Sequence, residues 1–106
     1  PASAQSGPSC QGWDFCIWSN GGYNGSFYKF YASGDPSDWI WTGWYGVSEV
    51  RSAKNSTNPG SGRRFRLSGV SAGNNVLCIP GGEVRPGPFN PPRSWMDWGP
   101  VGSPNC

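Results

Sequence analysis

The sequence contains no histidine, and only 13% of its 106 residues are charged. It therefore lacks the side chain that most often acts as a general base near neutral pH. The carboxylates are Asp14, Asp35, Asp38, Glu49, Glu83 and Asp97. They could in principle supply the acid and base of glycoside hydrolysis. They form no recognisable motif, however, and most lie in turns, where aspartate is common. We therefore expect a protein that is not an enzyme and needs no cofactor.

An excess of charge and long apolar runs are also absent. A net charge of +2 is too small to indicate a nucleic-acid partner. Arg63, Arg64 and Arg66 do cluster, but they have no aromatic platform among them, so we interpret them as a solvated face or strand edge. No apolar run reaches the roughly 18–20 residues that span a bilayer. Residues 1–9 are a polar lead-in that resembles the start of a mature secreted protein, so we expect secretion and no membrane partner.

Glycine, proline and aromatic residues are abundant. The 17 glycines and 11 prolines approach the proportion found in disordered chains. The seven Trp, four Tyr and five Phe argue for a compact core, because each such ring buries roughly 150–250 Å². Short aromatic strands joined by many turns satisfy both observations, and the sequence therefore predicts an all-β domain.

The four cysteines indicate two disulfides in an oxidising compartment. Three pairings are possible. We favour Cys10–Cys16 with Cys78–Cys106, because the second bridge would fasten a chain end that otherwise frays. A zinc site is disfavoured, since the sequence has no CxxC pair and no histidine.

Hydrophobic periodicity predicts several short strands and no helix longer than a turn. The predicted strands are 15–18, 26–33, 63–70 and 76–80. The strand at 26–33 carries aromatic residues on both faces, so we expect it to be well covered. Residues 51–62 are predicted to begin as a strand end and continue as a loop. Residues 83–106 are so rich in proline and glycine that we expect an ordered, extended tail outside the central sheet.

One local pattern resembles a known signature. The run Trp18-Ser-Asn-Gly-Gly-Tyr23-Asn-Gly25 resembles the βγ-crystallin Greek key, in which a folded-over hairpin joins the first two strands. The resemblance implies that Tyr23 packs over the hairpin and that Gly25 has a positive φ, which a side chain would penalise. It also implies a serine that ties back to the hairpin, for which we predict Ser48.

The cysteine pair ahead of this motif narrows the resemblance. The run CQGWDFC followed by the Greek-key signature is similar to the secreted actinobacterial peptidase inhibitors of crystallin type, among them the streptomycete metalloproteinase inhibitor. The implied fold is a βγ-crystallin-like Greek-key sandwich with an irregular C-terminal segment. After the lead-in at 1–9, a single domain would occupy 10–106. Its first key would span about 15–55 and a degenerate second key about 63–82.

Two departures from the family matter. Many microbial crystallin-type domains bind calcium through a pair of Asn or Asp residues just before the tie-back serine. Here those positions fall at about Trp44 and Tyr45, which offer no carboxylate or amide oxygen, so we expect no metal. The streptomycete inhibitor also presents its reactive bond on a second short disulfide loop. Only Cys78 stands in that region here, so the reactive bond and the class of target peptidase are not predicted.

The resemblance implies a monomeric inhibitor that occludes the active site of an extracellular peptidase as a substrate would. A proline-rich segment at 80–92 is suited to this role, because a backbone that is rigid before binding loses little entropy on association. The predicted contact residues are Glu83, Val84, Arg85, Pro86 and Phe89. The competing interpretation is a plain structural tail that covers the sheet.

The alternative function is a carbohydrate-binding, cell-wall-binding or antimicrobial toxin-like module. The aromatic side chains that would stack on sugar rings are Trp39, Trp41, Trp44, Trp95 and Trp98. Because aliphatic residues are scarce, we expect these rings to form the core instead.

Overall fold

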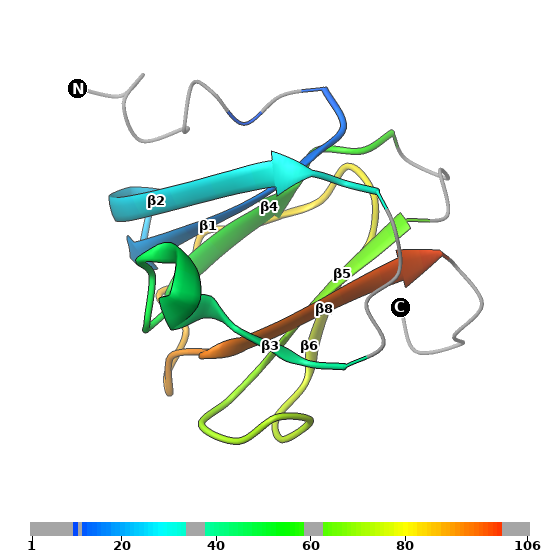
Figure 1. The fold of residues 1–106 in the computed structure, drawn as a ribbon. Coiled ribbons are helices and arrows are strands. Elements are labelled where there is room, and N and C mark those ends of the chain that lie inside the picture. The colour runs from blue at the N-terminus through cyan, green and yellow to red at the C-terminus, as the bar shows by residue number, and fades with distance from the viewer. Residues whose placement is uncertain (1–9, 11, 34–37, 59–62, 101–106) are drawn as a thin grey trace.

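The computed structural model describes residues 10, 12–33, 38–58 and 63–100, which form two antiparallel four-stranded sheets (Figure 1). The prediction of an all-β fold is confirmed. The elements are β1 (Asp14–Asn20), β2 (Asn24–Tyr31), β3 (Ile40–Trp41), the 3-10 turn η1 (Thr42–Tyr45), β4 (Ser52–Asn55), β5 (Arg63–Ser68), β6 (Leu77–Ile79), β7 (Val84–Arg85) and β8 (Trp95–Pro100). Within the described ranges, no helix is long and apolar enough to cross a bilayer.

The two halves of the chain exchange one strand each. The first sheet has the order β2-β1-β4-β7, and the second has the order β3-β8-β5-β6. The third strand of the first half, β3, therefore lies in the second sheet, and the third strand of the second half, β7, lies in the first. This arrangement is compatible with the Greek-key sandwich that the resemblance implies.

The core lies between the sheets and is built from inward-facing residues of both. Phe15 of β1 and Phe65 of β5 are fully buried, and their rings stack with centroids 4.6 Å apart. Leu67 points the same way as Phe65, as the alternation in this segment predicts. The two phenylalanine rings thus pack among buried side chains that are mainly aliphatic.

The prediction that residues 83–106 form an extended tail is wrong for two segments. Strand β8 lies in the interior of the second sheet, between β3 and β5, and β7 pairs with β4. The prolines are concentrated between these strands, and within β8 Pro100 is the last residue. Met96 is buried and Trp98 packs against the core, which is the alternation of an ordinary strand. Residues 101–106 lie outside the described part of the chain.

Two further predictions about strands need correction. Residues 52–55, expected to be little more than the end of a strand, form β4 in the interior of the first sheet. Residues 26–33 were expected to be well covered, but β2 is an edge strand whose outer face is exposed. Tyr31, for example, is 64% exposed. The aromatic residues on both faces of β2 therefore do not mean that other elements pack on both faces.

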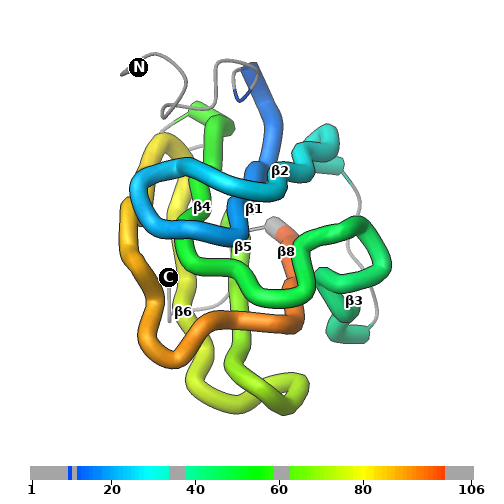
Figure 2. Tube along the Cα trace, turned by 90° about the vertical axis from the view of Figure 1, so that its left-hand side faces the viewer, coloured from blue at the N-terminus to red at the C-terminus, as the bar shows by residue number. Residues whose placement is uncertain are grey.

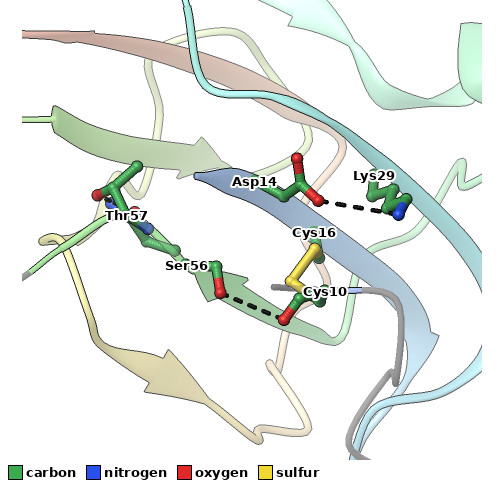
Figure 3. The surroundings of a disulfide bond; sticks show 7 residues. Cys10, Asp14, Cys16, Lys29, Ser56 and Thr57 are labelled. Atoms are coloured by element: carbon green, nitrogen blue, oxygen red, sulfur yellow. Dashed lines mark hydrogen bonds and ion pairs between the residues drawn. A yellow bond between two sulfur atoms is a disulfide. The ribbon is translucent and has the colours of Figure 1, made fainter. Parts of the chain in front are cut away.

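The Cys10–Cys16 disulfide is confirmed. Figure 3 shows the Ser56 side chain directed at this bridge, where its hydroxyl donates to the carbonyl oxygen of Cys10 at 3.2 Å. In the chain-entropy treatment a loop this short adds roughly 2 kcal/mol to stability. Cys78 in β6 is also disulfide-bonded. Its predicted partner, Cys106, lies outside the described residues, so that pairing stays a prediction.

Asn55 connects the two sheets through a buried polar side chain. Its amide nitrogen donates to the carbonyl oxygens of Ile79 at 2.8 Å and Arg63 at 3.0 Å, both in the second sheet. Its amide oxygen accepts from the hydroxyl and the backbone N–H of Thr57. The donor and acceptor capacity of the side chain is thus used inside the protein, which is the condition for burying an amide without a penalty.

Candidate functional site

The hairpin between β1 and β2 has the geometry that its sequence signature implies. The rings of Trp18 and Tyr23 meet edge to face with centroids 5.1 Å apart. Gly25 has a φ of +87°, and a Cβ added there would crowd the Asn20 side chain at 2.9 Å. The hairpin therefore requires glycine at this position for two reasons, its backbone conformation and its lack of space.

The serine that ties back to the hairpin is Ser52, and the choice of Ser48 is wrong. The Ser52 hydroxyl donates to the carbonyl oxygen of Asn20 at 2.7 Å and accepts from the backbone N–H of Tyr23 at 3.1 Å. Ser48 is exposed and four positions earlier. Ser52 was missed because the tie requires a residue inside the strand that pairs with β1.

This shift also moves the positions that correspond to the calcium pair. They fall at Ser48 and Glu49 rather than at Trp44 and Tyr45, so the original reason for expecting no metal no longer holds. The residues still do not fit a calcium ion. The Glu49 carboxylate is paired with the Arg51 guanidinium at 3.0 Å, and among the described residues no three His, Cys, Asp or Glu side chains cluster. Calcium takes six to eight oxygen ligands.

Four of the five predicted contact residues lie together on the surface, at the edge of the first sheet. Glu83, Val84 and Pro86 are exposed and Arg85 is half-buried. Arg85 forms an ion pair with Glu83 at 2.8 Å. Phe89 differs from the others, because its ring packs against the core. The structure thus brings Glu83–Pro86 to one surface and turns Phe89 away from it.

The segment is held to the sandwich by its backbone at both ends. At one end, the carbonyl oxygen of Glu83 accepts from the backbone N–H of Asn55 at 3.0 Å. At the other, the carbonyl oxygen of Pro86 accepts from Gly22 N–H at 2.8 Å, and Phe89 N–H donates to the carbonyl oxygen of Arg51 at 3.0 Å. The sequence interpretation did not identify these anchors. No local pattern marks a backbone group as the partner of a distant segment.

Gly87 sits where the segment approaches β4 most closely. A Cβ at this position would overlap the carbonyl oxygen of Arg51 and lie 2.7 Å from the backbone nitrogen of Phe89. Its φ is +63°, a value that other residues adopt only at a cost. The proline-rich composition indicated a rigid segment, whereas this one glycine permits its close contact with the sheet.

Two tyrosines near the first sheet have raised pKa values. Burial raises the pKa of Tyr23, and the nearby positive charge of Arg85 opposes part of that effect. Burial also raises the pKa of Tyr28, with a smaller contribution from Tyr45, whose ring stacks on it at 4.5 Å. In both cases the folded protein favours the neutral phenol.

These shifts predict a loss of stability at alkaline pH. Below the ordinary tyrosine pKa of 10.0, both states keep neutral phenols and the contribution is fully present. Above it the unfolded chain ionises first, so stability falls as the pH rises through the folded pKa. We expect the melting temperature of the double variant Tyr23→Phe/Tyr28→Phe to fall less steeply than that of the parent between about pH 9 and 11. Equal slopes would contradict the assignment.

A second surface is an open groove lined by aromatic side chains. It encloses about 490 Å³ and is lined by Trp39, Ile40, Trp41, Trp44, Tyr45 and Trp95. Trp41 of β3 lies directly opposite Trp95 of β8 in the ladder, so the two rings share the outer face of the second sheet. Trp44 projects from η1 and is 77% exposed. The volume lies within the range typical of small-molecule sites.

The prediction that these tryptophans form the core is wrong for the four that line the groove. Alternation along a continuous strand would place Trp44 on the face opposite to Trp39 and Trp41. The chain instead turns at η1, where the buried Thr42 is fixed by two hydrogen bonds to the carbonyl oxygen of Ser94. That turn brings Trp44 to the groove. Trp98 does follow the prediction, since it packs on Phe30 with ring centroids 4.5 Å apart.

Arg66 of β5 lies next to this groove. Arg66 forms a close ion pair with Asp97, and its guanidinium lies 5.2 Å from the centroid of the Trp39 ring. Its charge is therefore compensated within the fold. Arg63 and Arg64 are partly buried on the same strand.

The two surfaces lie at opposite edges of the molecule. Figure 2 shows β3 and the adjoining turn on the right and the segment after β7, in orange, on the left. The sheet orders agree, because β3 is an edge strand of the second sheet and β7 is an edge strand of the first. A partner at one surface therefore leaves the other accessible.

Comparison with known proteins finds a family match for the first half of the chain. The model of peptidase inhibitor family I36 matches residues 3–66, which is more than half of the sequence. No curated protein and no solved structure matches the chain. The resemblance to inhibitors of the streptomycete metalloproteinase inhibitor type is confirmed by this match. The chain belongs to peptidase inhibitor family I36, and it is a proteinaceous inhibitor rather than an enzyme.

Proposed function

We propose that the protein is secreted and, as a monomer, inhibits an extracellular peptidase by presenting Glu83–Pro86 to the active-site cleft. One observation carries this proposal. The segment is an exposed edge strand whose backbone is already fixed by hydrogen bonds to β4 and to the β1–β2 hairpin. A binding segment that is ordered before association avoids most of the entropic cost of ordering. Disulfide bonding supports an extracellular location.

Val84 is the central residue of the proposed contact. In an antiparallel ladder alternate residues direct their backbone groups toward the neighbouring strand. Glu83 bonds inward to Asn55, so the N–H and C=O of Val84 point outward. The C=O accepts from the Arg85 guanidinium at 3.1 Å, a hydrogen bond that a partner's N–H would replace. A peptidase that binds its substrate as an extended strand would pair with these outward groups. The Val84 side chain, 43% exposed, is then available for a specificity pocket.

The segment is also suited to resist cleavage. Arg85 is followed by Pro86, whose ring nitrogen has no N–H and whose φ is fixed. Anchors on both sides of Val84 would keep the ends of a cut bond together and favour its resynthesis. An inhibitor differs from a substrate because it stays in the cleft instead of being cut and released.

The test is titration against metallo-, serine and cysteine peptidases, following residual activity. We expect stoichiometric loss of one activity and a Ki raised by at least about 100-fold in Val84→Lys, the effect typical of a residue at the centre of an interface. Val76→Lys is the matched control, because Val76 is 46% exposed but lies just before β6 in the second sheet. Equal Ki values for the two variants would place the contact elsewhere.

Carbohydrate binding is a second candidate function, favoured by the aromatic groove. Exposed indole rings are costly to solvate, and clusters of them commonly mark a binding site. Most of the groove's lining residues belong to β3 and η1, which lie on the side opposite to the segment after β7 (Figure 2), so the two functions do not compete for one surface.

A further inference from the structure

We propose that the groove binds an uncharged chain of β-1,4-linked N-acetylglucosamine, as in chitin, and that it does so while a peptidase is bound. This assignment rests on the proposed carbohydrate binding and names the class of sugar. It follows from three properties of the groove: the rings that line it, the hydrogen-bond donors that those rings carry, and the lack of a charged side chain among its described lining residues.

The rings offer apolar faces to an amphipathic ligand. A β-linked pyranose chain with equatorial substituents has flat apolar faces and polar edges, which match indole rings that have an apolar face and one N–H. Trp41 and Trp95 stand side by side across the β3–β8 ladder, and Trp44 extends the surface at the turn. Sheet and turn hold these rings before any ligand binds, so little order is lost on association.

The groove is a hollow rather than a plane, and this favours an N-acetylated sugar. Ile40 contributes an aliphatic side chain to the lining, and an acetamido methyl group is small and apolar enough to contact it. Among the described residues, the indole N–H groups of Trp39, Trp41 and Trp44 have no hydrogen-bond acceptor, whereas that of Trp95 donates to the carbonyl oxygen of Val70 at 3.2 Å. Acetamido carbonyls would supply the acceptors that these donors lack.

The electrostatics favour an uncharged ligand. None of the described residues that line the groove is charged. Arg66, which lies next to the groove, is already paired with Asp97 and stacked against Trp39. A uronic acid or a sulfated sugar would therefore bring a charge into the groove without a counter-charge to meet it.

The experiment measures binding of soluble N-acetylchitohexaose by calorimetry and of the protein to insoluble chitin. We expect Trp44→Ala to weaken binding of the hexasaccharide at least tenfold while inhibition of the peptidase is unchanged. Tyr31→Ala is the matched control, because Tyr31 is 64% exposed but lies on β2. Gly43→Ala is a second variant, which removes no ring. Its added Cβ would overlap the Trp41 ring and displace it, so this variant too should weaken binding.

Each alternative outcome overturns a defined part of the inference. Equal affinity for cellohexaose would leave carbohydrate binding standing and remove the N-acetylglucosamine assignment. No binding to either hexasaccharide would remove the carbohydrate function altogether, whereas the inhibition assay would be unaffected. Displacement of the sugar by polyproline would assign the groove to a peptide. If the protein is released from chitin when the peptidase that it inhibits is added, simultaneous binding is contradicted.

Discussion

Replacement of Asn55 by alanine is expected to lower the free energy of unfolding by about 3–5 kcal/mol. The substitution leaves the carbonyl oxygens of Ile79 and Arg63 without the donor that now satisfies them. Each buried polar group left unpaired costs about 1–3 kcal/mol, and the lost contact with Thr57 adds to this. A domain of this size is stabilised by only about 5–15 kcal/mol. Urea unfolding followed by tryptophan fluorescence would measure the change.

Asn58→Ala is the control for this prediction. Asn58 follows Asn55 by three positions in the chain and is exposed, so its replacement should change stability by less than about 0.5 kcal/mol. Asn55→Asp offers a sharper test at nearly constant volume. It replaces the amide donor by an acceptor that faces two carbonyl oxygens, and it should destabilise the protein at least as much as alanine does. A small effect of both Asn55 variants would show that the amide does not connect the sheets.

Gly87→Ala is expected to abolish inhibition, with a Ki at least about 100-fold higher, equivalent to about 2.7 kcal/mol. The added Cβ would overlap the carbonyl oxygen of Arg51. This oxygen belongs to the backbone just before β4, so it cannot rotate away as a side-chain atom could. The segment must then move away from the sheet, and the hydrogen bond from Phe89 N–H to the carbonyl oxygen of Arg51 is lost. The preorganisation that the proposed inhibition depends on is lost with it.

Gly12→Ala separates this displacement from the cost of backbone conformation. Gly12 has a φ of +58°, close to the +63° of Gly87, but a Cβ added there has no atom within 4 Å. Both variants pay the left-handed penalty of roughly 1–2 kcal/mol, and Gly87→Ala alone meets the steric overlap. If the two variants inhibit equally well, the close approach of Gly87 to β4 is unimportant for function.

The sequence predicted those features that depend on residue type within a short window. The positive φ of Gly25 and the shared direction of Phe65 and Leu67 each follow from a few neighbouring residues. The Cys10–Cys16 bridge belongs to this class as well. Family membership followed from the same local pattern, because the hairpin signature and the cysteine loop are both contiguous in the chain.

Features that depend on distant partners were not predicted. Ser52 was missed because its role requires knowledge that β4 pairs with β1, and nothing near Ser52 indicates this. Residues 95–100 were assigned to a tail because proline content was averaged over a long window, which concealed a strand with normal alternation. The exposed tryptophans were assigned to the core on composition, although the turn at η1 directs Trp44 outward.

The exchange of third strands between the halves has an evolutionary consequence. The family match ends within β5, yet β3, inside the matched region, pairs with β8 beyond it. Selection that preserves the first half must therefore also preserve a second half that forms β7 and β8, even where the sequence of that second half changes. The side chains that β7 exposes carry no such requirement, because β7 pairs with β4 through its backbone. Descendants of one ancestor could thus acquire different target peptidases by changing Val84, which is exposed, without losing the fold.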